Sequence, residues 1–355
     1  MLLISEPGMR IGQKAHPWVR RLLLPLSVVT ILFASPADEK VTSEEPAGEG
    51  ELTTEGELPV RQVSGFYSAA EAYFSPDGGH LILNARREEG ETDYHVYTTS
   101  LDGTEILIIN DQGSDACSYF YPDGNRLVFT STRDHPELPR GDYSKVTDYP
   151  KGAELYCCNL DGSGRKRLTR NECYEAEVSV SPDGEWILFG RLTDGRMDLW
   201  RMRPDGSGEI RITDTPDWQE GGSFYLPDSE HIIYRAWKVE DQGKWPLPMT
   251  IFTIRHDGTE RRQITHDTGT NWSPHPSPDG VHFVFVKIVP PANYEVYLMN
   301  LATGQQNRLT HNPAFDGFPA FAPDGKTINF SSNREFEPRS KRMAVYLMDI
   351  SSLLD

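Results

Sequence analysis

The chain has 355 residues and a formal net charge of -18 at neutral pH, with 53 Asp and Glu residues against 35 Lys and Arg residues. This excess of negative charge repels the phosphates of nucleic acids and anionic membrane surfaces, so neither is an expected partner. We expect a monomer that contacts a membrane only if its apolar N-terminal segment is retained.

The N-terminus has the pattern of an export signal. Arg20 and Arg21 precede an apolar stretch of 13 residues, Leu22–Ala34, and small residues follow at Ser35 and Ala37. A membrane-spanning helix needs about 20 apolar residues. The pattern therefore favours a cleaved signal peptide, with an uncleaved anchor as the alternative. We predict a signal peptide over residues 1–37 and a periplasmic or secreted location.

An acidic segment follows, rich in Glu, Gly and Thr and almost free of large apolar side chains. Such a composition cannot bury enough apolar surface to offset the conformational entropy that folding costs. We predict that residues 38–57 form a disordered linker.

From residue 58 onward the chain repeats one pattern six times. Pro-Asp-Gly, or in one copy Pro-Asp-Ser, recurs at intervals of 45 to 60 residues. Its aspartates are Asp77, Asp123, Asp183, Asp228, Asp279 and Asp324. Each copy lies between two β-rich runs, and a third run with a central aromatic residue follows; a fourth run follows in most copies. Four strands per repeat are typical of a propeller blade. We predict an all-β fold, a six-bladed β-propeller of four-stranded antiparallel blades, over residues 58–355.

The sixth repeat ends one strand short, and a matching strand lies before the first repeat. Val63 precedes Asp77 by 14 residues, close to the 15 residues by which Leu168 precedes Asp183 in the third repeat. A strand that pairs with the last blade leaves no open sheet edge at the junction. We predict that residues 60–65 form the outer strand of the last blade and close the ring.

The repeated pattern of SPDG, an aromatic strand, an Asp-Gly turn and RLT resembles the TolB-like β-propeller repeats. The resemblance covers nearly the whole chain after residue 58 and implies the propeller fold. It does not imply one function, because one fold hosts many functions. Proteins of the TolB family carry an α/β domain before the propeller. We expect that domain to be absent here, so a role in the Tol–Pal envelope system does not follow.

The strand order predicts that the long insertions share one face of the propeller. Loops from the second to the third strand, and between blades, should lie opposite the Pro-Asp-Gly turns. Asp134–Gly152, Lys238–Pro248 and Val289–Asn293 all fall in such loops. We call this the long-loop face and the opposite one the turn face. Variable loops on a repeated scaffold commonly carry binding sites.

Polar residues at the start of the innermost strands are expected to surround the channel mouth on the long-loop face. They lie eight positions before the repeated aspartates, namely Asp115, Glu175, Glu220, Asn271 and Asp316. Basic residues end the second strands near the same face, among them Arg133, Arg191, Arg235 and Arg334. Two interpretations stay open: a ligand-binding rim, or acid–base pairs that lock neighbouring blades together. In the first blade Ala69 takes the position and Glu71 follows.

Aromatic residues in the loops of the long-loop face are candidate partner-binding residues, because exposed Trp and Tyr commonly anchor interfaces. They are Trp218, Trp245, Trp272, Tyr143 and Tyr149.

Histidines support an alternative, catalytic interpretation. His266, His275 and His311 are expected near the long-loop face or the channel. Three imidazoles could hold a divalent cation at the channel mouth, as in oligogalacturonate lyases, whose sequences carry similar repeats. The sequence contains no G-x-S-x-G motif of a serine hydrolase. The favoured interpretation assigns no catalytic residue, no metal and no cofactor.

The four cysteines leave two possibilities open. Cys157 and Cys158 are neighbours in one strand and should point to opposite faces. Cys117 and Cys173 lie near the starts of first strands in adjacent blades and could form a disulfide, or all four could be buried free thiols.

Together these features predict an exported, non-catalytic binding module. We expect it to use the long-loop face over the channel mouth to bind a protein or peptide of the cell envelope, or an oligosaccharide. The alternative is a metal-dependent lyase that acts on acidic oligosaccharides.

Overall fold

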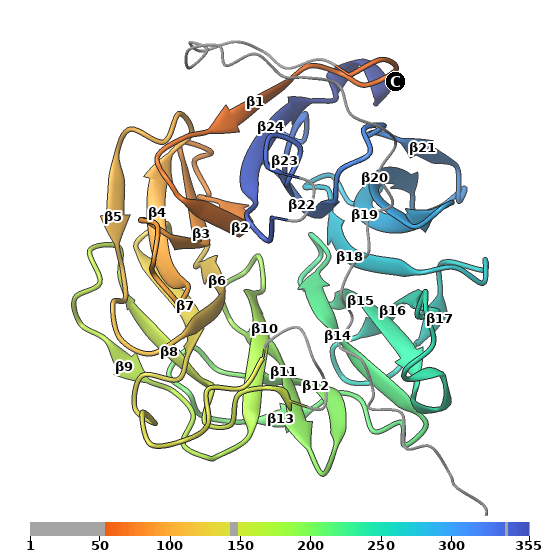
Figure 1. The fold of residues 1–355 in the computed structure, drawn as a ribbon. Helices are drawn as coiled ribbons and strands as arrows, with labels where there is room; N and C mark the ends of the chain where they lie inside the picture. The colour runs from red at the N-terminus through yellow and green to blue at the C-terminus, as the bar shows by residue number, and fades with distance from the viewer. Residues whose placement is uncertain (1–53, 143–147, 338–339, 355) are drawn as a thin grey trace, which may run out of the picture. The chain divides into compact units, whose positions relative to one another are not determined.

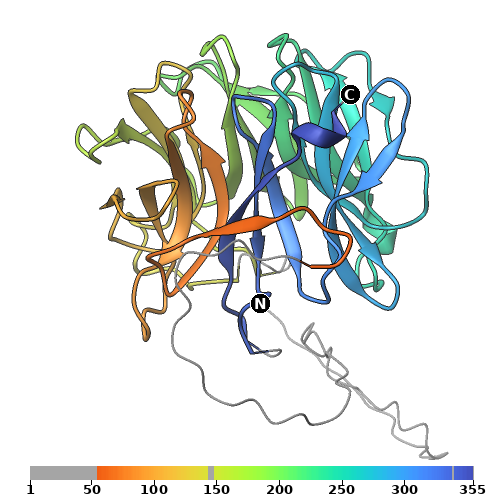
Figure 2. The ribbon, with the colours of Figure 1, turned by 90° about the horizontal axis from the view of Figure 1, so that it is seen from above.

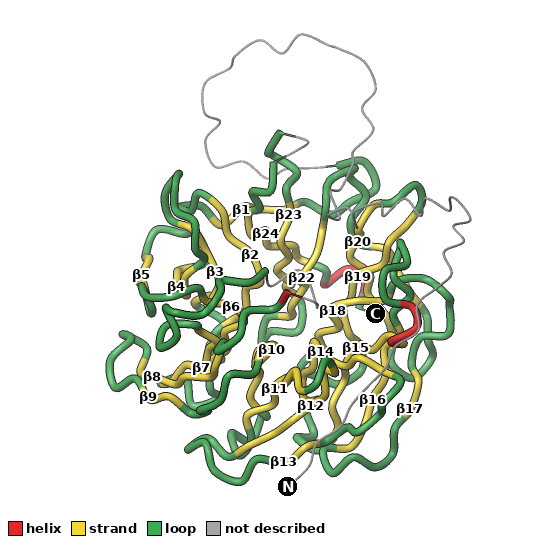
Figure 3. The backbone as a smooth tube through the Cα atoms, turned by 60° about the horizontal axis from the view of Figure 1, so that its bottom comes forward, coloured by secondary structure: helices red, strands yellow, loops and turns green. Residues whose placement is uncertain are grey.

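A computed structural model of the protein describes residues 54–142, 148–337 and 340–354. These ranges consist of β-strands and loops, with two short 3-10 helices, η2 (Val239–Asp241) and η3 (Ser351–Leu353) (Figure 3). No helix within them has the length and apolar character needed to cross a membrane. The signal peptide predicted over residues 1–37 lies outside the described residues, as does all of the predicted linker except residues 54–57, so both stay predictions.

The strands form six four-stranded antiparallel sheets around a central axis, which confirms the predicted six-bladed propeller (Figure 1). Blade one contains β2 (Ser68–Phe74), β3 (His80–Arg86), β4 (His95–Ser100) and β5 (Ile106–Ile108). Blade two contains β6 (Asp115–Phe120), β7 (Arg126–Ser131), β8 (Glu154–Asn159) and β9 (Lys166–Arg167). Blade three contains β10 (Tyr174–Val180), β11 (Ile187–Thr193), β12 (Arg196–Met202) and β13 (Ile210–Arg211).

The last three blades have the same order, with the innermost strand first. Blade four contains β14 (Trp218–Tyr225), β15 (His231–Lys238), β16 (Thr250–Arg255) and β17 (Arg262–Gln263). Blade five contains β18 (Asn271–Pro276), β19 (His282–Val289), β20 (Asn293–Asn300) and β21 (Gln306–Arg308). Blade six contains β22 (Asp316–Phe321), β23 (Thr327–Ser332), β24 (Ala344–Asp349) and, as its outermost strand, β1 (Val60–Val63).

The strand β1 closes the ring as the sequence predicts. It pairs antiparallel with β24, with Val60 opposite Met348 and Val63 opposite Val345, and Figure 2 shows the two strands side by side. The strand ends at Val63, two residues earlier than predicted. Both valines are buried, so the closure adds apolar contacts as well as backbone hydrogen bonds.

Contact with the propeller begins before its first strand. Glu57, the last residue of the predicted linker, has a side chain only 1% exposed and lies 2.8 Å from the Arg334 guanidinium. A buried carboxylate needs such a partner, because desolvation penalises an unpaired charge. The ordered part of the chain therefore includes Glu57.

The core lies between neighbouring blades. Second strands are buried on both faces, as in Leu81–Leu83 and Phe283–Val286, because blades pack face to face around the axis. This explains why the second runs of the repeats contain continuous apolar residues instead of alternating ones.

Candidate functional site

Each innermost strand contains a β-bulge at the same place, six residues before the repeated aspartate. The pairing with the second strand shifts there in every blade, for example between Ala70 and Tyr73 in β2. The residue in the bulge has a left-handed backbone, with φ between 43° and 57°. These residues, which we call the bulge ring, are Glu71, Cys117, Glu177, Gly222, Ser273 and Phe318. Side chains are costly in this conformation, and bulges commonly redirect side chains near functional sites.

Aromatic side chains close the channel two residues further along the same strands. The Tyr73 ring of blade one lies 5.5 Å from Phe224 of blade four, on the opposite side of the ring. Tyr119 lies 5.2 Å from Tyr73, and His275 lies 4.7 Å from Phe224. We call these four residues the aromatic plug. Because innermost strands start at the long-loop face, the bulge ring and the plug form the wall and floor of a cup that opens on that face.

Glu71 is the carboxyl group of the cup with no ion-pair partner among the described residues. Its Oε1 accepts a hydrogen bond from the Tyr73 hydroxyl at 3.4 Å, and its Oε2 accepts one from Asn84 Nδ2 at 3.2 Å. Burial raises the pKa of Glu71 to about 7, the neighbouring Cys117 thiol opposes this rise, and the negative charge of Glu177 adds to it. Glu71 therefore gains or loses its charge near neutral pH.

Glu177 joins blades three and four at the cup. Its Oε1 lies 2.5 Å from an Arg235 guanidinium nitrogen, and its Oε2 accepts the backbone N–H of Gly222 at 2.6 Å. A Cβ atom at Gly221 would lie only 2.0 Å from Glu177 Oε2. The Gly-Gly pair in β14 thus leaves the space into which Glu177 extends from the neighbouring blade.

The three histidines of the alternative interpretation do not come together. His275 is buried in the plug, where its Nδ1 accepts the backbone N–H of Phe321 at 3.2 Å. Burial lowers the pKa of its imidazole to about 3, so the ring stays neutral. His266 and His311 are exposed. Across the described ranges no group of three His, Cys, Asp or Glu side chains could hold a metal ion.

The polar residues predicted as an open rim are buried. Asp115, Glu175, Glu220, Asn271 and Asp316 are each at most 2% exposed. They lie two positions before the bulge ring, which occupies the cup in their place. The predicted rim is therefore not an exposed surface of the cup.

Two of the buried acids pair with the predicted cations of their own blades. Arg191 Nε lies 2.5 Å from Glu175 Oε1, and Arg334 lies 3.0 Å from Asp316 Oδ1. In these blades the structure favours the second interpretation of the sequence, in which acids and bases hold the blades together.

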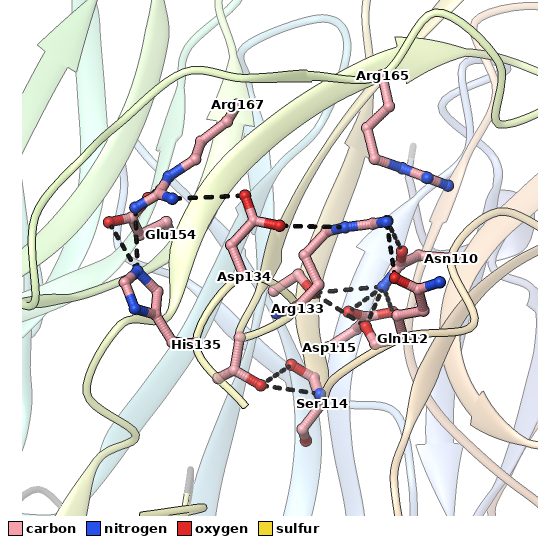
Figure 4. Close-up of polar contacts among 12 residues, drawn as sticks. Asn110, Gln112, Ser114, Asp115, Arg133, Asp134, His135, Glu154, Arg165 and Arg167 are labelled. Atoms are coloured by element: carbon pink, nitrogen blue, oxygen red, sulfur yellow. Dashed lines mark hydrogen bonds and ion pairs between the residues drawn. The ribbon is translucent and has the colours of Figure 1, made fainter. Parts of the chain in front are cut away.

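Blade two uses a larger polar network for the same purpose (Figure 4). Asn110 Nδ2 donates to both carboxylate oxygens of Asp115, at 2.8 and 2.9 Å, and Arg133 hydrogen bonds to Asn110 in turn. Next to Arg133, Asp134 lies 3.4 Å from Arg167 of β9. The network fixes the start of the Asp134–Gly152 insertion to the blade.

An aromatic strip leads from the long-loop surface to the cup. Trp245 is 52% exposed, and its ring lies 6.2 Å from Tyr294. Tyr294 lies 5.0 Å from Phe315 and 6.2 Å from Trp272, which lies 4.8 Å from Phe318 in the bulge ring. These five residues, the aromatic strip, come from blades four, five and six, and the structure thus unites two of the predicted anchors, Trp245 and Trp272.

The other predicted anchors lie elsewhere. Trp218 packs edge-on against Phe252 at 5.4 Å, within the core of blade four. Tyr149 stacks on Tyr174 at 4.2 Å and is partly buried. Tyr143 lies outside the described residues.

All four cysteines are free, so Cys117 and Cys173 do not form a disulfide. Cys117 belongs to the bulge ring, where burial and the negative charges of Glu71 and Glu177 raise the pKa of its thiol well above the usual range. A thiol of this kind stays protonated and is a poor nucleophile.

Sequence reasoning missed Glu177, Tyr294, Phe315 and Phe318. A constant offset from the repeated aspartates locates Glu177 and Phe318, because Gly222, the glycine that the bulge favours, lies at that same position in blade four. No comparable signal marks Tyr294 and Phe315, which belong to loops and strand ends of different blades.

A family model for the TolB β-propeller domain matches residues 227–352, from the turn of blade four to the end of the ring. An uncharacterized protein of Agrobacterium fabrum is 31% identical over 144 residues, which are 39% of this chain and 48% of that protein. A TolB homologue of Chlorobium luteolum is 29% identical over 157 residues, 43% of this chain and 32% of that protein. The chain thus spans about half or less of the length of these relatives.

Solved structures share the fold. A protein of Agrobacterium tumefaciens described as a TolB aligns with a TM-score of 0.57 at 20% identity, over 82% of this chain and 97% of that one. An oligogalacturonate lyase in complex with manganese aligns with a TM-score of 0.58 at 15% identity, over 86% and 97%. The fold and its cup define the protein as a six-bladed β-propeller with a site at the axis. Among such propellers it is a TolB-like one.

Proposed function

We propose that the protein is a binding module that holds a segment of a partner protein or a peptide on the long-loop face. The observation that carries this proposal is the aromatic strip, which runs from exposed Trp245 to Phe318 inside the cup. Aromatic side chains bury a large area at small entropic cost and dominate the energetics of many interfaces. A partner side chain inserted into the cup would extend the same apolar contact.

The construction of the cup suits recognition. Its side chains are held by contacts between blades, such as Glu177 with Arg235 and the Phe321 N–H with His275. A site that is rigid before binding loses little conformational entropy when a partner docks. The export signal and the TolB-like propeller support a location in the periplasm or outside the cell, with a partner in the cell envelope.

The test is a peptide selected by display on the full chain, with affinity measured by fluorescence anisotropy. Replacing an aromatic anchor costs about 2 kcal/mol, or roughly 30-fold in Kd, so Trp245→Ala should weaken binding by this amount. Val239→Ala, in the same insertion and 38% exposed, should leave the affinity unchanged. Equal affinities for wild type, Trp245→Ala and Phe318→Ala would refute the proposal. Selection of oligosaccharides but no peptides on the strip would replace the partner class.

A further inference from the structure

The repeated turns form an interlocked ring on the turn face. A Cβ atom at Gly78 of blade one would lie 3.8 Å from the Pro323 ring of blade six, which is van der Waals contact. The equivalent contacts are Gly184 with Pro122, Gly280 with Pro227, and Gly325 with Pro278. Between blades three and four, where Ser229 replaces the glycine, its hydroxyl accepts the backbone N–H of Asp183 at 3.1 Å. Five of the six blade junctions are thus closed by one repeated contact.

The sixth junction, between blades one and two, is open. A Cβ atom at Gly124 would meet nothing within 4 Å, although Pro76 occupies the equivalent position in blade one. A groove of about 840 Å³ lies in this gap, lined by the turns of both blades. Its apolar lining includes Ile106, Leu107, Phe120 and Leu160, of which Leu107 is 44% and Leu160 38% exposed. Exposed apolar surface of this kind marks interaction sites.

The outer strand beside the groove lacks the protection that the other outer strands have. Exposed sheet edges are normally guarded by charged side chains, which prevent pairing with another strand. The five guarded strands each contain Lys or Arg, namely β1, β9, β13, β17 and β21. The strand β5 consists of Ile106, Leu107 and Ile108, and Ile108 is also 41% exposed. As the last strand of its sheet, β5 has a free edge.

Charge around the groove indicates what would cover it. Its lining, as described, contains the carboxylates of Asp77, Glu105 and Asp123 and no Lys or Arg. Asp123 is paired with Arg126 at 2.8 Å, whereas the Glu105 side chain is 79% exposed with only His80 nearby, at 3.9 Å. A hydrogen bond from Ser75 lowers the pKa of Asp77, which keeps this group charged. The groove thus combines an apolar floor with a negative rim.

We propose that the groove between blades one and two is a second docking site, which takes an extended segment of a partner protein with alternating apolar and basic side chains. The free edge of β5 fits an added strand. In a strand, alternate side chains point to opposite sides, so one row reaches the apolar floor and the other meets the carboxylates.

The test uses the full chain and a labelled peptide of alternating Val and Lys, with fluorescence anisotropy at low and high salt. We expect binding that weakens with salt, and affinities about tenfold or more lower for alternating Val-Glu and Thr-Lys peptides. Leu107→Lys and Leu160→Lys should each weaken binding by about tenfold, and Glu105→Lys should also flatten the salt dependence. Ile210→Lys, at a 42% exposed residue of an outer strand in blade three, and Glu230→Lys should change nothing.

Several results would overturn the proposal. One is binding that survives both leucine substitutions, and another is equal binding of the Val-Glu peptide. Binding that is lost in Trp245→Ala but kept in Leu107→Lys would place the peptide at the cup. A dimer in sedimentation equilibrium that dissociates in Leu107→Lys would identify a second copy of the chain as the occupant. Because the two sites lie on opposite faces, failure here leaves the function proposed for the cup untouched.

Discussion

Phe318 lies against Trp272, with ring centroids 4.8 Å apart and ring planes at 69° to each other. Phe318 belongs to the strained bulge of blade six, and Trp272 belongs to blade five. This edge-to-face contact joins the aromatic strip to the cup, so the surface and the channel mouth form one continuous apolar path. An edge-to-face pair is also a favoured arrangement of aromatic rings, which helps to hold Phe318 in its costly backbone conformation.

Ring closure predicts a large effect of removing β1. A chain that starts at Ser68 lacks Val60 and Val63, each buried against blade six. Burying one such side chain contributes about 2 kcal/mol, so the free energy of unfolding should fall by roughly 4 kcal/mol or more. Urea denaturation measures the difference, with a chain that starts at residue 54 as the control. Equal stability of the two chains would contradict the role of β1.

The ion pair between Glu177 and Arg235 predicts a second effect on stability. Glu177→Gln leaves the Arg235 guanidinium, in a residue only 4% exposed, without its counter-charge. Breaking a buried pair in this way costs about 3 kcal/mol. Glu185→Gln breaks the exposed pair with Arg203 and should cost less than about 1 kcal/mol. Similar losses in both variants, measured by urea denaturation, would show that Glu177 does not hold blades three and four together.

The fold could be predicted from the sequence because each blade repeats the same turn, and a repeat of four β-rich runs leaves few alternatives to a propeller. The closing strand could be predicted because Val63 keeps the same distance to its turn as Leu168 does. These inferences depend on spacing along the chain, which the sequence records directly.

The candidate site could be predicted only in part. The face was right for Trp245 and Trp272, but Glu175 and its equivalents are buried, and Glu177 and its equivalents occupy the cup. A one-residue bulge changes which side chains face the axis, and no sequence period reveals a bulge. The strip combines side chains of three blades, whose proximity depends on packing between blades.

Glu71 predicts a dependence of stability on pH. Its pKa is raised from 4.5 to about 7, so the folded chain keeps a proton that the unfolded chain has already lost. This contribution to stability is complete below the unfolded value and is lost as the pH rises through about 7. Glu71→Gln should therefore be more stable than wild type at about pH 8, by about 2 kcal/mol, and equally stable at about pH 4.

Urea denaturation at both pH values measures this difference, and Glu89→Gln, in an exposed loop, is the control that should match wild type throughout. A difference between Glu71→Gln and wild type that does not change with pH would contradict the raised pKa of Glu71.

The central claim, that a partner docks over the strip and the cup, is tested most directly by site-specific photo-crosslinking with the display-selected peptide. Val239 and Val281 are matched positions, 38% and 45% exposed, on the long-loop face of blade four and the turn face of blade five. With benzoylphenylalanine at each position in turn, we expect the peptide to crosslink from position 239 and not from position 281. Crosslinking from position 281 alone would contradict the assignment of the site to the long-loop face.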